Sequence, residues 1–399
     1  MQAYRDHRNG KATDVSLAIA QDDAIREAIA LQEAVGLESI TDGEFRRASY
    51  WSSFVERVDG LEIKDAAFTF RDECGHEQVF TAPHVSGPVR RQQAIAVDEF
   101  DFVRASTSQT PKTTLPSPPS MHFWRVDQGI DKAVYPDAKS YFTDLAAVYR
   151  QEIAALAAAG STYIQLDDVP FAMLCDPEVR AEVASKNIDP DQLLQDYVAL
   201  CNDSLRDRPP GVTVAMHFCR GNYKAHFLSQ GGYEAVADLL FNGLTVDAYF
   251  LEFDSPRAGD FTPLRFMPTG RRVVLGLIST KTPILENPDT LMRRVDEAAL
   301  HIDPAAICIS PQCGFASTIG GNPLTISEQR AKLSLVVETA AALLRHSTSL
   351  KTQIAAHYVT AIQKRSRVTL PDDAPLLDNE MMIGDGSEIS HILVNDQYR

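Results

Sequence analysis

The chain has 399 residues, of which 44% are hydrophobic and 23% charged, so it can form a large core and a barrel fold could use most of its length as one domain. The formal net charge of −16 argues against nucleic acid or an anionic membrane surface as the main partner. No apolar run of 18 residues occurs, and the start of the chain lacks the apolar core of a secretion signal. Six cysteines in such a chain indicate reduced thiols. We therefore expect a cytoplasmic protein with no membrane partner.

Apolar runs of β type alternate with longer helical patterns along the chain. Residues 14–35 place apolar side chains at helical spacing, and Gly36 follows as a stop signal. Near-continuous hydrophobic strands between helices indicate a parallel sheet buried on both faces. Further helices are expected at 140–159, 288–300 and 325–345, and strands at 37–44, 113–118, 162–168, 212–219, 248–254, 272–279 and 306–313.

This alternation predicts an α/β fold, a (β/α)8 TIM barrel with its active site at the carboxyl ends of the strands. Only seven strands are visible, and the eighth should precede the helix at 14–35, so the first strand of the barrel is expected to be missing from this chain. Residues 62–110 are expected to form an inserted hairpin packed over the barrel. We assign residues 1–347 to the catalytic barrel and 348–399 to a C-terminal extension of unknown role.

Side chains that bind zinc stand at the ends of three predicted strands. His217 and Cys219 end one strand, and side chains two apart on a strand point to the same side. Glu252 ends the next strand and Cys313 a later one, and zinc accepts nitrogen, sulfur and carboxylate oxygen in tetrahedral sets. This wide spacing is unlike that of a zinc finger, so we expect a catalytic zinc with one position open for substrate. A structural zinc is the alternative for the same residues.

Polar clusters at other strand ends predict a substrate pocket. Glu44 in D-G-E-F-R-R and Asp167 in Q-L-D-D could together hold an ammonium group by charge-assisted hydrogen bonds. The alternative for Glu44 is a buried ion pair with Arg46 or Arg47. The predicted substrate-binding set also contains Asp168 and two cations that could bind a carboxylate or phosphate or form a solvated rim, Arg220 and Lys281.

Six segments together resemble one family: D-G-E-F-R-R, I-Q-L-D-D, H-F-C-R-G-N, L-E-F-D-S-P-R, L-G-L-I-S-T-K-T-P and S-P-Q-C-G-F. Over roughly residues 14–345 the chain resembles the cobalamin-independent methionine synthases, specifically the short, single-barrel homologues of their C-terminal catalytic half. The resemblance implies a (β/α)8 barrel that transfers a methyl group from 5-methyltetrahydrofolate, usually polyglutamylated, to the sulfur of homocysteine, giving methionine. It implies zinc ligands at His217, Cys219, Glu252 and Cys313, with Glu44 and Asp167 on the homocysteine amino group.

The same resemblance leaves some roles open. The leaving folate nitrogen needs a proton, and His122 and His226 are the candidate donors. Family members usually open with a strand whose Gly-Ser pair binds the amino-acid carboxylate, and this chain is expected to start after that strand. Short homologues also differ in their methyl donor. The alternatives are another zinc-thiolate alkyltransferase, such as one that opens an epoxide with a thiol, and a degenerate barrel without catalysis.

Overall fold

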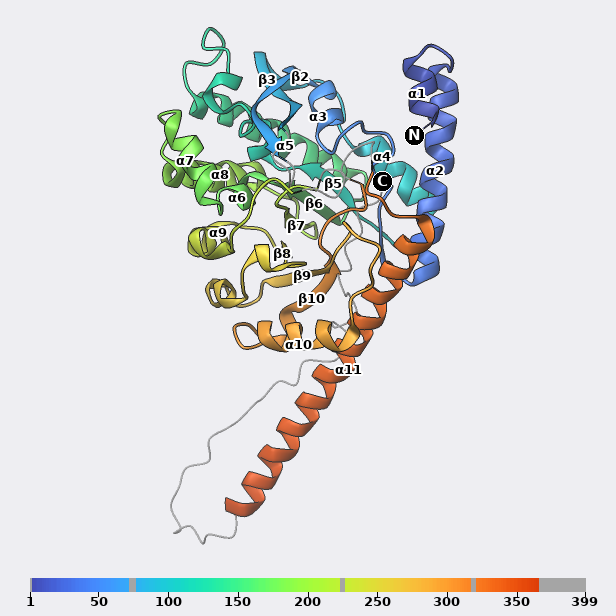
Figure 1. Cartoon of the computed structure of the whole chain (residues 1–399), viewed down its shortest axis with the longest axis vertical. Helices are drawn as coiled ribbons and strands as arrows, with labels where there is room; N and C mark the ends of the chain where they lie inside the picture. The colour runs from blue at the N-terminus through green and yellow to red at the C-terminus, as the bar shows by residue number, and fades with distance from the viewer. Residues whose placement is uncertain (1, 72–76, 223–226, 317–320, 366–399) are drawn as a thin grey trace.

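The computed structural model describes residues 2–71, 77–222, 227–316 and 321–365, with the backbone alone for 67–71, 77–79 and 346–365. Its main sheet contains six parallel strands in the order β10-β9-β8-β7-β6-β5 (Figure 1). Each strand follows its sequence neighbour through helical segments, as the alternating pattern predicted. The strand bounds are β5 Thr113–Pro116, β6 Tyr163–Asp168, β7 Thr213–Phe218, β8 Ala248–Glu252, β9 Arg272–Ile278 and β10 Ile307–Pro311.

A seventh strand lies beyond β5. The short β1 (Ser39–Ile40) pairs in parallel with β4 (Thr110–Pro111), which stands one residue before β5. All seven predicted strands are therefore confirmed, and so is the mixed α/β class. Within the described residues, no pairing joins β10 to β1 and no strand precedes the first helices. Closure into a (β/α)8 barrel thus stays a prediction.

Helix α2 (Asp14–Val35) has a capping group at each end. The Thr13 hydroxyl accepts from Ser16 N, and Gly36 ends the helix with a left-handed φ of 93°. α11 (Ile326–Arg365) continues beyond the predicted end at 345, so the boundary predicted at 347 falls inside a helix. None of the described helices is long and apolar enough to cross a membrane. The other α-helices are α1 Gln2–Arg8, α3 Ser52–Arg57, α4 Val97–Ser106, α5 Ala138–Ala158, α6 Pro170–Met173, α7 Pro177–Ser185, α8 Pro190–Leu205, α9 Ala237–Gly243 and α10 Pro288–Ala298.

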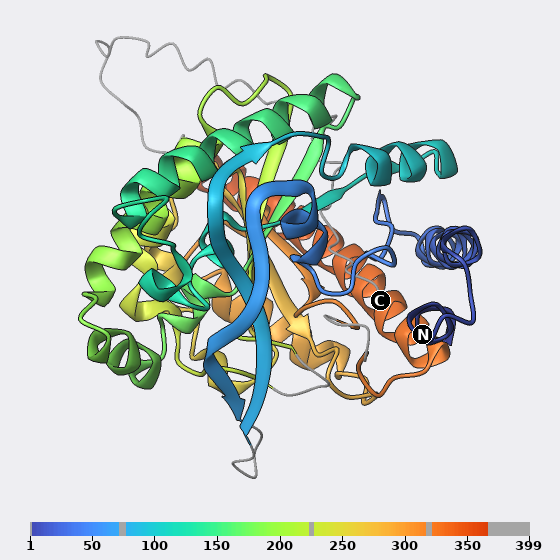
Figure 2. The same ribbon diagram turned by 90° about the horizontal axis from the view of Figure 1, so that it is seen from above.

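The predicted hairpin is present between β1 and β4. It consists of β2 (Val58–Arg71) and β3 (Glu77–Arg91), which pair antiparallel. In the view from above, the hairpin passes in front of the strands of the main sheet (Figure 2). Helix α4 fills most of the remainder of the predicted insertion, so that segment is part hairpin and part helix.

A buried carboxylate joins this hairpin to the helices. Glu152 of α5 accepts hydrogen bonds from Ile95 N (3.0 Å), Ala96 N (2.7 Å) and Arg91 Nε (2.7 Å), and its side chain is fully buried. We expect Glu152→Ala to lower the free energy of unfolding by about 3–5 kcal/mol, because it leaves a guanidinium and two amides without their partner. Urea unfolding measures this change. A loss below about 1 kcal/mol would show that Glu152 does not hold the hairpin to the helices. A change of that size is expected for an exposed pair such as Arg104–Asp101.

Candidate active site

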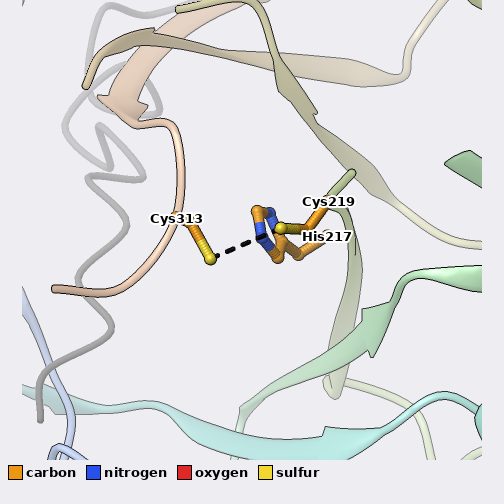
Figure 3. A group of neighbouring side chains, drawn as sticks. All are labelled: His217, Cys219 and Cys313. Atoms are coloured by element: carbon orange, nitrogen blue, oxygen red, sulfur yellow. Dashed lines mark hydrogen bonds between the residues drawn. The ribbon is translucent and has the colours of Figure 1, made fainter. Parts of the chain in front are cut away.

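A histidine and two cysteines meet at the carboxyl ends of β7 and β10. His217 is in β7, Cys219 follows that strand, and Cys313 follows β10. One ligand atom from each lies within 4.8 Å of the others, and the two sulfur atoms are 3.6 Å apart (Figure 3). Two strands separate β7 from β10, and across a flat sheet such strands would be about 14 Å apart. The sheet therefore curls around the site, and three of the four predicted ligands come together.

The donors present fit a zinc ion. His217 Nε2 is buried and has no hydrogen-bond partner among the described residues, although a buried polar atom normally requires one. The hydrogen bond from Cys219 and the proximity of His217 hold the pKa of Cys313 well below its ordinary value, which favours the thiolate that binds metals. One imidazole nitrogen and two sulfur atoms could occupy three corners of a tetrahedral zinc site.

Glu252, the fourth predicted ligand, lies beside this group and outside it. Its Oε2 accepts from Arg220 N at 2.6 Å and its Oε1 accepts from Lys281 Nζ at 3.0 Å. Burial opposes the charge of Lys281, but Glu252 and Asp254 raise its pKa above the ordinary value, so this ammonium stays charged. Each carboxylate oxygen has a second lone pair, so Glu252 could bind a metal while keeping these partners. Its ligand role stays a prediction.

Two further carboxylates face the site from neighbouring elements. Asp167 is the penultimate residue of β6 and lies opposite His217 in the strand register; Gln165 Nε2 donates to its Oδ1 at 2.6 Å. Burial, together with the nearby charge of Glu44, raises the pKa of Asp167 to about 7. Glu44 accepts from Thr114 Oγ1 at 2.7 Å. Glu44 also pairs with Arg47 at 3.1 Å, so the ion pair considered as its alternative is present as well.

Asp168 and Arg220, both predicted to bind substrate, contact the protein itself. Asp168 accepts from Ser117 Oγ at 2.5 Å and from Phe171 N at 2.7 Å, which ties β5 to the first turn of α6. The fully buried Arg220 guanidinium donates to Gly231 O at 2.9 Å and to Glu252 O at 3.2 Å. These contacts are those of residues that hold loops in place around the site.

Of the two candidate proton donors, only His122 is described. Its Nδ1 lies 2.8 Å from the hydroxyl of Tyr197, and the ring packs against Tyr141 and Phe142. Burial lowers the pKa of His122, so the imidazole is neutral near pH 7. It is not part of the group around Cys313. His226 lies outside the described residues.

A polar network around Cys313 was not predicted. The Thr280 hydroxyl contacts Gln312 Oε1 (2.8 Å) and Gly314 O (2.9 Å), which flank the cysteine, and Asn222 Nδ2 donates to Gly314 O at 2.8 Å. These residues fix the loop that carries the sulfur. The available signal was their position, because Thr280 lies two residues beyond the end of β9 and Asn222 four residues beyond the end of β7.

Comparisons with known proteins indicate the family to which the chain is similar. The model of the cobalamin-independent synthase catalytic domain matches residues 1–342. YxjH of Bacillus subtilis strain 168, named an uncharacterized protein, is 37% identical over 343 residues, which cover 85% of this chain and 89% of YxjH. A 5-methyltetrahydropteroyltriglutamate–homocysteine methyltransferase of Thermosynechococcus vestitus is 24% identical over 76% of this chain and 36% of its own length. A crystal structure of a Listeria monocytogenes protein assigned to the vitamin-B12-independent methionine synthases matches with a TM-score of 0.68 and 30% identity, covering 86% of this chain and 92% of that one.

Proposed function

The chain belongs to the cobalamin-independent methionine synthase family, a family of methyltransferases, and we propose that it methylates the sulfur of homocysteine at a zinc ion. The observation that carries the proposal is the meeting of the His217 imidazole and the thiols of Cys219 and Cys313 among buried carboxylates. The name of the Thermosynechococcus relative supports homocysteine as acceptor and a methyltetrahydrofolate as donor. Glu252 is the proposed fourth ligand.

In this proposal His217, Cys219 and Cys313 hold the ion and the neighbouring carboxylates hold the substrate. A bound zinc ion supplies a Lewis acid that lowers the pKa of the substrate thiol, so that a thiolate is present near neutral pH. Asp167 and Glu44 accept hydrogen bonds from the substrate ammonium group and so orient its sulfur. Such alignment of sulfur with a donor methyl contributes up to about 7–11 kcal/mol of the rate enhancement.

The charge of the pocket separates this function from its nearest alternative. An alkyltransferase acting on a sulfonate thiol would need cations where the acceptor binds. The residues proposed to hold the acceptor, Asp167 and Glu44, are carboxylates close enough to interact, and Lys281 is paired with Glu252. The arrangement supports an acceptor that carries an ammonium group.

Calorimetric titration of homocysteine into protein of known zinc content tests the proposal. We expect about one zinc per chain, and release of about one proton per homocysteine because the thiol is bound as a thiolate. Removal of the metal by a chelator is expected to abolish homocysteine binding, and zinc addition to restore it. Zinc without homocysteine binding would indicate a different thiol acceptor. A protein that binds no zinc when supplied with it would refute the metal site.

A further inference from the structure

A buried ion cluster lies behind Glu44. Arg47 donates twice to Glu99 Oε2, from Nη2 at 2.6 Å and from Nε at 3.1 Å, and once to Glu44 Oε1, at 3.1 Å. Arg47 also donates to Thr114 O at 2.9 Å. Glu99 comes from α4 and Thr114 from β5, so separate elements converge on one guanidinium. Arg47 and both carboxylates are buried.

Carboxyl groups outnumber guanidinium groups in this cluster. Arg47 brings one positive charge, whereas Asp42, Glu44 and Glu99 bring three carboxyl groups. The adjoining cavity of about 10 Å³ holds at most about one water molecule. Lys112 also lines it, but this lysine donates from its Nζ to Gln165 Oε1 at 3.4 Å. If Arg47 paired with Glu44 alone, its charge would cancel the charge that attracts a substrate ammonium group. The shorter, doubled contact to Glu99 directs Arg47 mainly away from Glu44.

Hydrogen bonds hold both the backbone and the side chain of Glu44 in place. Glu44 has a left-handed φ of 54°, a conformation that residues other than glycine seldom adopt. Its N–H donates to Asp42 Oδ1 at 2.9 Å, and its carboxylate is held by Thr114 and Arg47. Strained backbone persists where the surrounding contacts determine it, and such sites serve to preorganise a functional group.

We propose that Glu99 is a positioning residue for the acceptor's ammonium group. By neutralising Arg47, Glu99 lets the same guanidinium anchor Glu44 without removing its negative charge, and Glu44 then faces the ammonium together with Asp167. The inference rests on the proposed function and deepens it. It assigns part of the preference for thiols that carry an α-amino group to a residue that does not touch the substrate.

The test compares homocysteine with 4-mercaptobutanoate, which is homocysteine without its amino group. In Glu99→Gln we expect the dissociation constant of homocysteine to rise about 10-fold, with less than about a twofold change for 4-mercaptobutanoate and unchanged zinc content. Calorimetry measures both ligands. Asp247→Asn is the matched control: that carboxylate holds Arg208 at 2.6 Å at the amino-terminal ends of the strands, and its loss should leave the preference unchanged.

The possible outcomes separate this inference from the proposed function. A native protein that does not prefer homocysteine would refute the proposed function itself. A Glu99→Gln protein that keeps the native preference, or loses affinity for both ligands together with zinc, would overturn the positioning role. Glu99→Asp keeps the charge and should keep the preference. If Glu99→Gln does not fold, Glu99→Asp provides the test. A preference for homocysteine over 4-mercaptobutanoate within about threefold of native supports the positioning role, and a lost preference with normal zinc content overturns it.

Discussion

Replacing Cys313 by serine is expected to remove most of the bound zinc and to abolish methyl transfer. The hydroxyl does not ionise near neutral pH, so the site loses one of two sulfur ligands and the negative charge that the depressed pKa of Cys313 provides. We expect zinc affinity to fall at least about 100-fold, as loss of one ligand from a set worth about 10–16 kcal/mol implies. Turnover should fall by at least about 1000-fold, equivalent to about 4 kcal/mol in the barrier. Metal analysis after dialysis and a methionine-formation assay measure the two effects.

Cys308→Ser is the matched control for this change. Cys308 lies on β10, the strand that Cys313 follows, and is also buried, but it packs with the apolar cluster that includes Tyr163, Phe250 and Val274. The same substitution there should reduce stability and leave zinc content intact. Full zinc and full activity in Cys313→Ser would mean that the metal site has been assigned to the wrong residues.

Asp167→Asn is expected to keep zinc and to lose affinity for homocysteine. The asparagine has nearly the same shape, and its carbonyl oxygen can still accept the hydrogen bond from Gln165. It lacks the charge, and hydrogen bonds to charged groups contribute about 1.5–3 kcal/mol, so homocysteine should bind about 10–100-fold more weakly. The loss should be much smaller for 4-mercaptobutanoate, which has no ammonium group.

Calorimetry with both ligands, alongside zinc analysis, checks this expectation. Asp247→Asn again supplies a carboxylate-to-amide change remote from the pocket. Normal homocysteine affinity in Asp167→Asn would argue against an ammonium site at this carboxylate. A loss of zinc would instead indicate that Asp167 supports the metal ligand opposite it in the register, His217.

The meeting of His217, Cys219 and Cys313 was predictable from two simple rules together with the curvature expected of a barrel, which brings the ends of β7 and β10 toward each other. Side chains two apart on a strand share a side, and parallel strands bring their carboxyl ends to one edge of a sheet. Neither rule requires knowledge of tertiary contacts. The same rules placed Asp167 beside the metal group, and the structure agrees.

Where the prediction was incomplete, the deciding contacts are long-range. Glu252 stands at the predicted strand end, but Lys281 and the Arg220 amide, both outside its own strand, determine where its carboxylate lies. Asp168 carries the same chemical groups as Asp167, yet the hydroxyl of Ser117, just after β5, and an amide of α6 donate hydrogen bonds to it. Periodicity identifies the strand end that a side chain occupies, whereas the partner of a long polar side chain depends on the packing of other elements.

The wide separation of the ligands along the chain has a consequence for biogenesis. Cys219 and Cys313 are 94 residues apart, and two further strands must take their places between β7 and β10 before the sulfur atoms can meet. A partly synthesised or misassembled chain therefore lacks the chelating site, and the ion would be taken up only after this half of the sheet has formed. Because a ligand that binds only the native state stabilises it by mass action, metal uptake would then stabilise the fully folded state relative to partly folded ones. Metal retention would accordingly distinguish correctly assembled molecules from misfolded ones in a purified sample.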